Sequence, residues 1–265
     1  MSEMSKAGSL RAQGLAKAYR AKGQPAVQVL DECSLTVDAG RLTVLMGPSG
    51  SGKSTLAYIL AGYVEPDMGE VHLDGAKVRG PGPDRLMVFQ ESTLWPWMSV
   101  NANVLFGPKM RASGASPDAD ARAHELLVRF GLAEFANKYP GQLSGGMKRR
   151  AEIAQALIND PRVLIMDEPF RGLDVMTREL MQEYYLKVFE ETRPTTLFIT
   201  SEIEEAIFLA DVILFMDPTQ RRIGHSIEID LPRPRTFDVM ASEKYREIKA
   251  RAMEVLYEHE NGETV

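Results

Sequence analysis

The sequence predicts an α/β fold built on a mostly parallel β-sheet. Short runs of branched apolar residues recur along the chain, and stretches with helical periodicity separate several of them. A glycine-rich loop follows one apolar run directly and leads into a helix candidate. The chain has 265 residues, 44% of them hydrophobic, which is enough apolar material for one large domain with subdomains.

Strand candidates begin close to the N-terminus. From about Leu10 to Leu45 apolar and polar residues alternate, which predicts several strands, the last of them buried. The short segment Glu70–Leu73 and the apolar run Leu86–Phe89 are the next strand candidates. From about residue 91 to residue 160 the patterns are mostly helical, and we interpret this stretch as a helical subdomain inserted between strands.

The second half of the chain resumes the alternation of strands and helices. The elements expected here are strands at Arg162–Met166, Thr196–Thr200 and Val212–Met216 and a helix at Thr177–Glu190. Pro232 and Pro234 then exclude a helix, and a further helix candidate runs from about Ser242 to Glu258.

Composition limits the classes of function. The formal net charge is −6 and the pI is near 5.4, which argues against nucleic-acid binding because such binding needs a concentrated basic surface. The single cysteine, Cys33, allows neither an internal disulfide nor a thiolate metal cluster and fits a reducing cytoplasm. No secretory signal and no run of about eighteen apolar residues occurs, so we expect any membrane-spanning partner to be another polypeptide.

The glycine-rich loop has the pattern of a phosphate-binding loop. Residues Gly47–Thr55 read GPSGSGKST and lie between an apolar strand candidate and a helix candidate. Glycines let successive backbone N–H groups point at phosphate oxygens, and the helix N-terminus adds partial positive charge. Lys53 is expected to bridge the β- and γ-phosphates of ATP, and the Ser54 hydroxyl to bind Mg²⁺. The alternative is a loop that is merely rich in glycine and serine. The residues expected to contact ATP here are Gly47, Ser49, Gly50, Ser51, Gly52, Lys53, Ser54 and Thr55.

A second candidate anion site lies far along the chain. Leu143–Met147 reads LSGGM and opens a strongly helical run, so Ser144 stands where a helix N-cap belongs. The phosphate loop already surrounds the phosphates of one nucleotide, and the second site is therefore expected to meet the γ-phosphate held by another copy of the chain. The residues expected to make that contact are Ser144, Gly145 and Gly146; the alternative is a plain capped helix.

The motifs GPSGSGKST, LSGGM and VLIMDEP, in this order and spacing, resemble the Walker A, signature and Walker B motifs of ATP-binding cassette (ABC) proteins. The resemblance runs from about Leu10 to Leu231. It implies a P-loop NTPase core with a mostly parallel sheet, an N-terminal antiparallel β part and an inserted helical subdomain at roughly 91–160. We expect the cassette domain to cover residues 8–231 and a helical C-terminal extension to cover 232–265.

The resemblance also implies roles around the Walker B strand, whose carboxyl end is where open α/β sheets place ligand chemistry. Asp167 is expected to hold Mg²⁺ through water and Glu168 to polarise the attacking water, whereas the alternative is a solvated Asp-Glu turn. Gln90 matches the Q-loop glutamine, which lies near Mg²⁺ and the attacking water. Tyr19 lies where the family stacks an aromatic ring on adenine, with a buried core tyrosine as the alternative. Asp174 lies in the segment that resembles the D-loop, through which two copies would sense each other.

The segment FQESTLWPWMSVNANV resembles the part of nitrate, sulfonate and taurine importers that faces the membrane-spanning partner. Trp95 and Trp97 suit a groove for a partner's helix, although they could instead be ordinary core residues. The closing LPRPR also resembles this subgroup. The implied partners are a second cassette, transmembrane permease subunits and an external solute-binding protein, at the cytoplasmic face of the membrane. The transported solute cannot be read from this sequence, because selectivity would reside in these partners.

The sequence departs from the family at the switch histidine, whose position Ser201 occupies. A serine oxygen could reach the γ-phosphate only through a water or a shifted loop, and loss of one donor at a reacting oxyanion costs about 10²–10³ in rate. Arg149 and Gln155 also replace a commonly seen glutamine and arginine.

Three functions therefore compete. The first is a slow ATPase that powers an importer, with Glu168, Lys53, Gln90 and Ser201 as the catalytic set and ATP and Mg²⁺ as the cofactors. The second is a regulatory ATP-binding subunit that scarcely hydrolyses ATP. The third is a soluble cassette ATPase of DNA repair or translation, which the single cassette, the acidic balance and the LWPWM segment disfavour.

Overall fold

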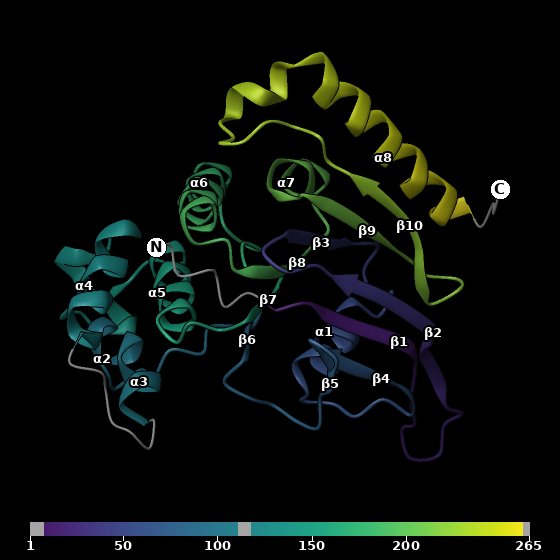
Figure 1. The fold of residues 1–265 in the computed structure, drawn as a ribbon, viewed down its shortest axis with the longest axis horizontal. Helices are drawn as coiled ribbons and strands as arrows, with labels where there is room; N and C mark the ends of the chain where they lie inside the picture. The colour runs from purple at the N-terminus through teal and green to yellow at the C-terminus, as the bar shows by residue number, and fades with distance from the viewer. Residues whose placement is uncertain (1–7, 111–117, 262–265) are drawn as a thin grey trace.

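The computed structural model describes residues 8–110 and 118–261 and contains two sheets and a group of helices to one side (Figure 1). The smaller sheet is antiparallel, and its four strands lie in the order β2 (Val27–Val37), β1 (Leu10–Tyr19), β4 (Met68–Leu73) and β5 (Ala76–Lys77). The larger sheet has six strands in the order β10 (Arg222–Glu228), β9 (Val212–Asp217), β3 (Leu42–Met46), β8 (Thr195–Thr200), β7 (Val163–Asp167) and β6 (Arg85–Val88). All its neighbouring strands are parallel except β10, which runs antiparallel to β9.

The helices fall into two groups. Those around the larger sheet are α1 (Lys53–Ala61), α6 (Val175–Thr192), α7 (Ile203–Leu209) and α8 (Glu243–Asn261), with a 3-10 turn at Phe237–Ala241. Those at the left of Figure 1 are α2 (Val100–Val104), α3 (Phe106–Met110), α4 (Ala119–Arg129) and α5 (Gly145–Leu157), with 3-10 turns at Ala133–Phe135 and Pro140–Gln142. Within residues 8–110 and 118–261, no helix has the length and apolar character needed to cross a bilayer.

The expected α/β fold with a mostly parallel sheet and an N-terminal antiparallel part is confirmed. Strand β10 was not predicted from the sequence, because it is an edge strand with Ile227 as its one buried residue and shows no apolar run. Residues 111–117 of the predicted helical subdomain lie outside the described residues, as do residues 262–265 of the predicted extension.

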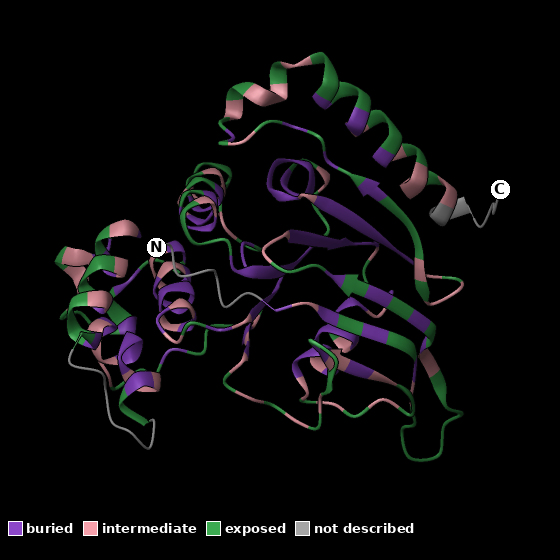
Figure 2. Cartoon of the chain, in the orientation of Figure 1, coloured by how far each residue is buried: buried purple, intermediate pink, exposed green. Residues whose placement is uncertain are grey.

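The core is divided in two by the larger sheet. Side chains of β7 alternate between the halves, with Val163 and Ile165 facing α1 and the antiparallel sheet, and Leu164 and Met166 facing the helices on the other side. Because β7 and β9 are buried on both faces, they read as apolar runs up to their final aspartates, whereas the equally buried β8 also contains three threonines. By contrast β1 alternates between buried and exposed residues along part of its length (Figure 2).

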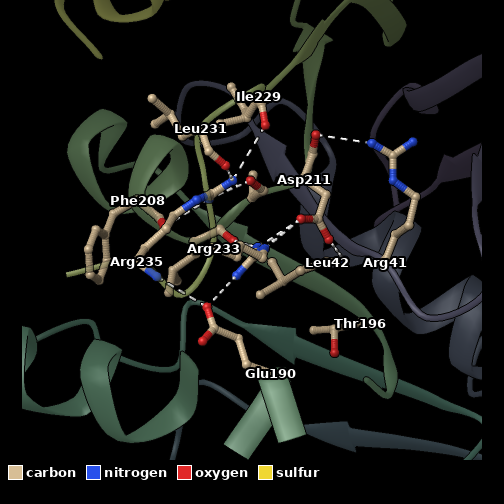
Figure 3. Close-up of polar contacts among 12 residues, drawn as sticks. Arg41, Leu42, Glu190, Thr196, Phe208, Asp211, Ile229, Leu231, Arg233 and Arg235 are labelled. Carbon is tan, nitrogen blue, oxygen red and sulfur yellow. Dashed lines mark hydrogen bonds and ion pairs between the residues drawn. The ribbon is translucent and has the colours of Figure 1, made fainter. Parts of the chain in front are cut away.

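Two arginines of the LPRPR segment fasten the chain after β10 to the end of α7 (Figure 3). The buried Arg235 donates hydrogen bonds to carbonyl groups that α7 and the neighbouring chain leave free, namely those of Ile207, Phe208, Ala210, Ile229 and Leu231. Burial lowers the pKa of the Arg235 guanidinium to about 10. From this anchored segment the chain enters α8, which packs on α7 and β9.

Arg233 fastens the same segment to the sheet (Figure 3). Its guanidinium contacts the Asp211 carboxylate at 2.8 Å and Glu190 at 3.3 Å, and it donates to the Leu209 carbonyl. Asp211 in turn accepts a hydrogen bond of 2.8 Å from the backbone N–H of Leu42, the first residue of β3. The end of α7 is therefore tied to the strand that leads into the phosphate loop.

Candidate functional site

Four loops meet at one edge of the larger sheet. Because β3, β6, β7 and β8 are parallel neighbours, their carboxyl ends lie on the same side, with Met46 paired to Thr200, Asp167 to Ile199 and Val88 to Met166. The residues that follow these ends are the phosphate loop, Glu168, Ser201 and Gln90. Residues separated by more than a hundred positions in the sequence are thereby gathered where open α/β sheets bind ligands.

The phosphate loop depends on glycine at defined positions. Gly50 and Gly52 have φ of 82° and 102°, which favour a residue without a side chain. A Cβ on Gly52 would lie 2.8 Å from the Val29 carbonyl oxygen. Gly52 precedes α1 without a side-chain cap, so the first N–H groups of this helix remain available to an anion.

Lys53 closes the loop on itself. Its buried ammonium group donates to the carbonyl oxygens of Gly47 at 2.8 Å and Pro48 at 2.9 Å. Burial lowers the pKa of Lys53, and the negative charges of Glu168 and Asp167 partly offset that effect. A phosphate group would offer this ammonium group a charged partner in place of two neutral carbonyls.

Asp167 has unused hydrogen-bonding capacity. It is the buried last residue of β7, and its Oδ1 atom has no hydrogen-bond partner among the described residues. Burial raises the pKa of this carboxyl, while a hydrogen bond from the Ser54 hydroxyl acts in the opposite direction. A buried carboxylate oxygen beside a hydroxyl is a donor set that suits a hard divalent cation.

Glu168 is held in an uncommon backbone conformation directly after β7. Its φ is 44°, and its N–H donates to the Ile199 carbonyl at 3.0 Å, which extends the pairing of β7 with β8 by one residue. The Glu168 carboxylate forms an ion pair with Arg171 at 2.7 Å. The predicted alternative of a solvated Asp-Glu turn therefore does not describe these residues, since Asp167 is buried and the Glu168 side chain is only 10% exposed.

Gln90 follows β6, and the chain at this point is fastened to α5. Arg149 donates to the carbonyl groups of Phe89 and Gln90, each at 2.5 Å, and to Glu152 at 2.8 Å. Glu152 accepts a hydrogen bond of 2.6 Å from the Thr93 N–H. The arginine that departs from the family pattern is thus half of a buried ion pair that joins the Q-loop to the signature helix.

Tyr19 and Ser201 are both accessible. Tyr19 ends β1 and is 42% exposed, so the alternative of a buried core tyrosine is wrong. Lys17 lies 5.8 Å from the centre of its ring. Ser201 lies exposed between β8 and α7, next to Glu202, whose N–H donates to the Thr200 hydroxyl at 3.0 Å.

The signature segment begins α5 as predicted. The Ser144 hydroxyl accepts a hydrogen bond of 3.3 Å from the Met147 N–H, which makes Ser144 the N-cap. Ser144 and Gly145 are exposed. Gly146 is buried, and a Cβ there would lie 2.5 Å from Thr177 Cγ2. Gly145 therefore leaves the start of the helix uncovered, whereas at Gly146 the absent side chain lets α5 approach α6.

Asp174 has a local role in the structure. It is the N-cap of α6, with its carboxylate accepting from the N–H of Thr177 at 3.0 Å and from the Thr177 hydroxyl at 2.7 Å. These bonds lower the pKa of Asp174 below its usual value. The same cap fixes the position of the D-loop relative to α6.

The LWPWM segment presents aromatic side chains to solvent. Trp97 is 69% exposed and Trp95 is 38% exposed, with ring centres 5.3 Å apart, so the alternative of ordinary core tryptophans is wrong for both. The loop is built around the fully buried Asn103, whose amide group accepts from the Trp95 N–H and donates to the Trp95, Met98 and Ser99 carbonyls. This scaffold keeps the tryptophans on the surface.

Sequence reasoning missed Glu152, Asn103 and Arg171 as residues of the site. A signal existed for Glu152, since it stands three positions after Arg149 in a helix candidate and the two charges would share one face. Nothing in the sequence pattern marks Asn103 or Arg171, because their contacts are set by how the loops fold.

Comparisons with known proteins found a matching family, similar sequences and similar folds. The family described as ABC transporter matches residues 30–171. A taurine import ATP-binding protein from Pseudomonas entomophila is 45% identical over 202 residues, which is 76% of this chain and 78% of the relative. A nitrate import ATP-binding protein from Synechococcus elongatus is 40% identical over 232 residues, 86% of this chain and 84% of the relative. A solved dimeric ATP-binding cassette in a post-hydrolysis state with ADP and Pi is 29% identical and has a TM-score of 0.74, covering 84% of this chain and 100% of that one.

Proposed function

The chain belongs to the ABC transporter family, as an ATP-binding and ATP-hydrolysing subunit, and we propose that two copies of it power a membrane permease that imports a small solute. Its relatives are named for taurine and nitrate import, and the solved cassette that it resembles is dimeric. The observation that carries the proposal is the meeting of the phosphate loop, Asp167 and Glu168 at one edge of a parallel sheet.

The proposed organisation follows from this assignment. Residues 8–231 form the cassette domain, with residues 91–160 as its helical subdomain, and residues 232–265 form the extension that Arg233 and Arg235 fasten to α7. The cassette sits peripherally on the cytoplasmic face of the membrane, where Trp95 and Trp97 meet the permease. An external solute-binding protein delivers the solute.

ATP binding uses groups that form hydrogen bonds within the phosphate loop in this structure. The adenine ring stacks on the exposed Tyr19. Lys53 exchanges the carbonyl groups of Gly47 and Pro48 for β- and γ-phosphate oxygens. The remaining contacts come from backbone and hydroxyl groups of Gly47, Ser49, Gly50, Ser51, Gly52, Ser54 and Thr55.

The residues present fit a bound Mg²⁺. Ser54 would ligate it through the hydroxyl, and Gln90 through its amide oxygen. Asp167 would hold it through water, using the carboxylate oxygen that has no hydrogen-bond partner in the described part of the chain. When bound, the ion supplies positive charge that stabilises the developing charge on the phosphates.

Glu168 activates the attacking water in this proposal. The water oxygen forms a bond to the γ-phosphorus as the bond to the β,γ-bridging oxygen breaks, and ADP leaves with that electron pair. The Glu168 carboxylate takes the proton that the water loses, an effect worth about 10²–10⁴-fold in rate. Gln90 orients this water, and Ser201 reaches the γ-phosphate through a second water.

The second copy of the chain completes each site. Ser144 and Gly145 are exposed at the start of α5 and suit the γ-phosphate held by the partner's phosphate loop, with Gly146 shaping the helix start. Asp174 places the D-loop at the same interface through its cap on α6. Closure of the two copies on ATP, and reopening after hydrolysis, moves the permease.

The comparisons do not support the alternative of a regulatory subunit without hydrolysis. Glu168 is present directly after β7, and the similar cassette was solved with ADP and Pi. The import relatives also disfavour a soluble cassette of DNA repair or translation.

Steady-state release of phosphate from ATP and Mg²⁺ tests the proposal. The parent chain should release phosphate, and Glu168→Gln should lower the rate by about 10² or more while ATP still binds. Glu254→Gln, an exposed carboxylate on α8, is the matched control and should match the parent. Phosphate release by Glu168→Gln at the parent rate would refute the role of Glu168, and a parent that binds no ATP would refute the function itself.

A further inference from the structure

Arg171 is joined to Glu168 by a tight turn and by an ion pair. The Arg171 N–H donates to the Glu168 carbonyl at 3.1 Å, and the Arg171 guanidinium contacts the Glu168 carboxylate at 2.7 Å. The two side chains differ in freedom, because the Glu168 side chain is only 10% exposed and that of Arg171 is 59% exposed. The carboxylate is therefore fixed in the site, whereas the guanidinium reaches it from solvent.

The guanidinium lies within the electrostatic field of the phosphate loop. Glu168 and Asp167 favour the charged form of the Lys53 ammonium group, and the positive charge of Arg171 opposes them. Four ionisable groups thus share one small region. The two cations, Lys53 and Arg171, offset the charges of the two carboxylates.

A triphosphate changes this balance. It brings several negative charges to the loop that holds Lys53, and a planar guanidinium binds phosphate oxygens with two parallel hydrogen bonds. The same guanidinium holds Oε2 of Glu168, one of the two carboxylate oxygens that could accept the proton of the attacking water. Arg171 cannot serve both partners in one position, and its exposed side chain is free to turn.

We propose that Arg171 is a substrate-contacting residue whose guanidinium leaves Glu168 for the γ-phosphate of bound ATP and thereby frees the carboxylate for the attacking water. The inference rests on the proposed role of Glu168. It adds a cation at the γ-phosphate, supplied by a residue shortly after the Walker B segment, in a site where Ser201 supplies no charge.

The competing view is that Arg171 only anchors Glu168. The two views predict different effects of Arg171 on the affinities for ATP and ADP, because ADP has no γ-phosphate. An anchoring arginine affects ATP and ADP alike, whereas a γ-phosphate contact adds affinity for ATP alone.

The test compares binding of the β,γ-imido analogue of ATP with binding of ADP, both with Mg²⁺, by calorimetric titration. Arg171→Ala should weaken binding of the analogue by about tenfold to hundredfold, as expected for a charge-assisted hydrogen bond, and leave ADP affinity within about twofold. Arg171→Lys should recover part of the loss, since a lysine keeps the charge without the planar fork. Arg222→Ala, an exposed arginine on β10, is the control and should match the parent.

Equal effects on the analogue and ADP, or no effect on either, would overturn the inference, as would an Arg171→Ala variant that releases phosphate faster than the parent. These outcomes differ from failure of the proposed function, in which the parent chain itself neither binds the analogue nor releases phosphate from ATP.

Discussion

Glu152→Ala removes one half of the buried ion pair that joins α5 to the Q-loop. The side chains of Arg149 and Glu152 are 9% and 3% exposed, and their contact is 2.8 Å. Burial lowers the pKa of Arg149, and the charge of Glu152 acts against that shift. Without Glu152 the guanidinium stays buried with only neutral carbonyl partners, and the N–H of Thr93 loses its acceptor.

The expected cost is about 3–5 kcal/mol of stability, the range for breaking a buried pair by removing one partner. For a chain of this size each 1 kcal/mol lowers the melting temperature by about 2–4 °C, so a loss of at least about 6 °C is expected. Arg149→Met combined with Glu152→Ala removes both charges and should be less destabilised than the sum of the two single variants.

Thermal unfolding followed by circular dichroism measures this difference. The matched control is Glu125→Ala, which breaks an exposed pair with Arg129 at 2.6 Å in the same group of helices. That pair should contribute no more than about 1 kcal/mol. If Glu152→Ala and Glu125→Ala shift the melting temperature equally, or if the double variant loses at least the sum of the singles, the reasoning from burial is refuted.

Four further predictions concern other parts of the chain. Ser201→His should raise steady-state phosphate release by about 10²-fold by supplying a direct donor to the γ-phosphate, and an unchanged rate would show that the position is not limiting. Trp97→Glu should abolish co-purification with the permease while the isolated chain keeps its ATPase rate; Tyr257→Glu, another exposed aromatic, should retain the permease, and loss with both variants would contradict a specific docking face. Arg235→Met should lower the melting temperature by about 6 °C or more because several helix-end carbonyls lose their donor, and a shift below about 2 °C would contradict this account. Burial raises the pKa of the Cys33 thiol to about 11, so native protein at pH 7.5 should react with a thiol reagent far more slowly than protein unfolded in urea, and equal rates would show that the thiol is exposed.

Local patterns were sufficient for much of the fold. The strands β3, β7, β8 and β9 could be predicted because each is buried on both faces and therefore contains a run of at least three apolar residues. The phosphate loop could be predicted because backbone curvature and close approach require glycine at fixed spacing. Strand β10 could not, since an exposed edge strand is held by pairing with β9 and places little demand on its own side chains.

Part of the candidate site could likewise be predicted from the sequence, and part of it could not. The phosphate loop and the Asp167–Glu168 pair each belong to a short motif whose pattern extends over a few neighbouring positions. The sequence by itself therefore determined that this chain binds and hydrolyses ATP. Only the tertiary structure decided that Arg149 and Glu152 fasten the Q-loop, that Gly146 serves helix packing and that Arg171 pairs with Glu168. These are contacts between side chains and loops whose distances depend on how strands, turns and helices pack. The spacing of Arg149 and Glu152 along a helix indicates that the two charges pair, but it does not show which loop they hold.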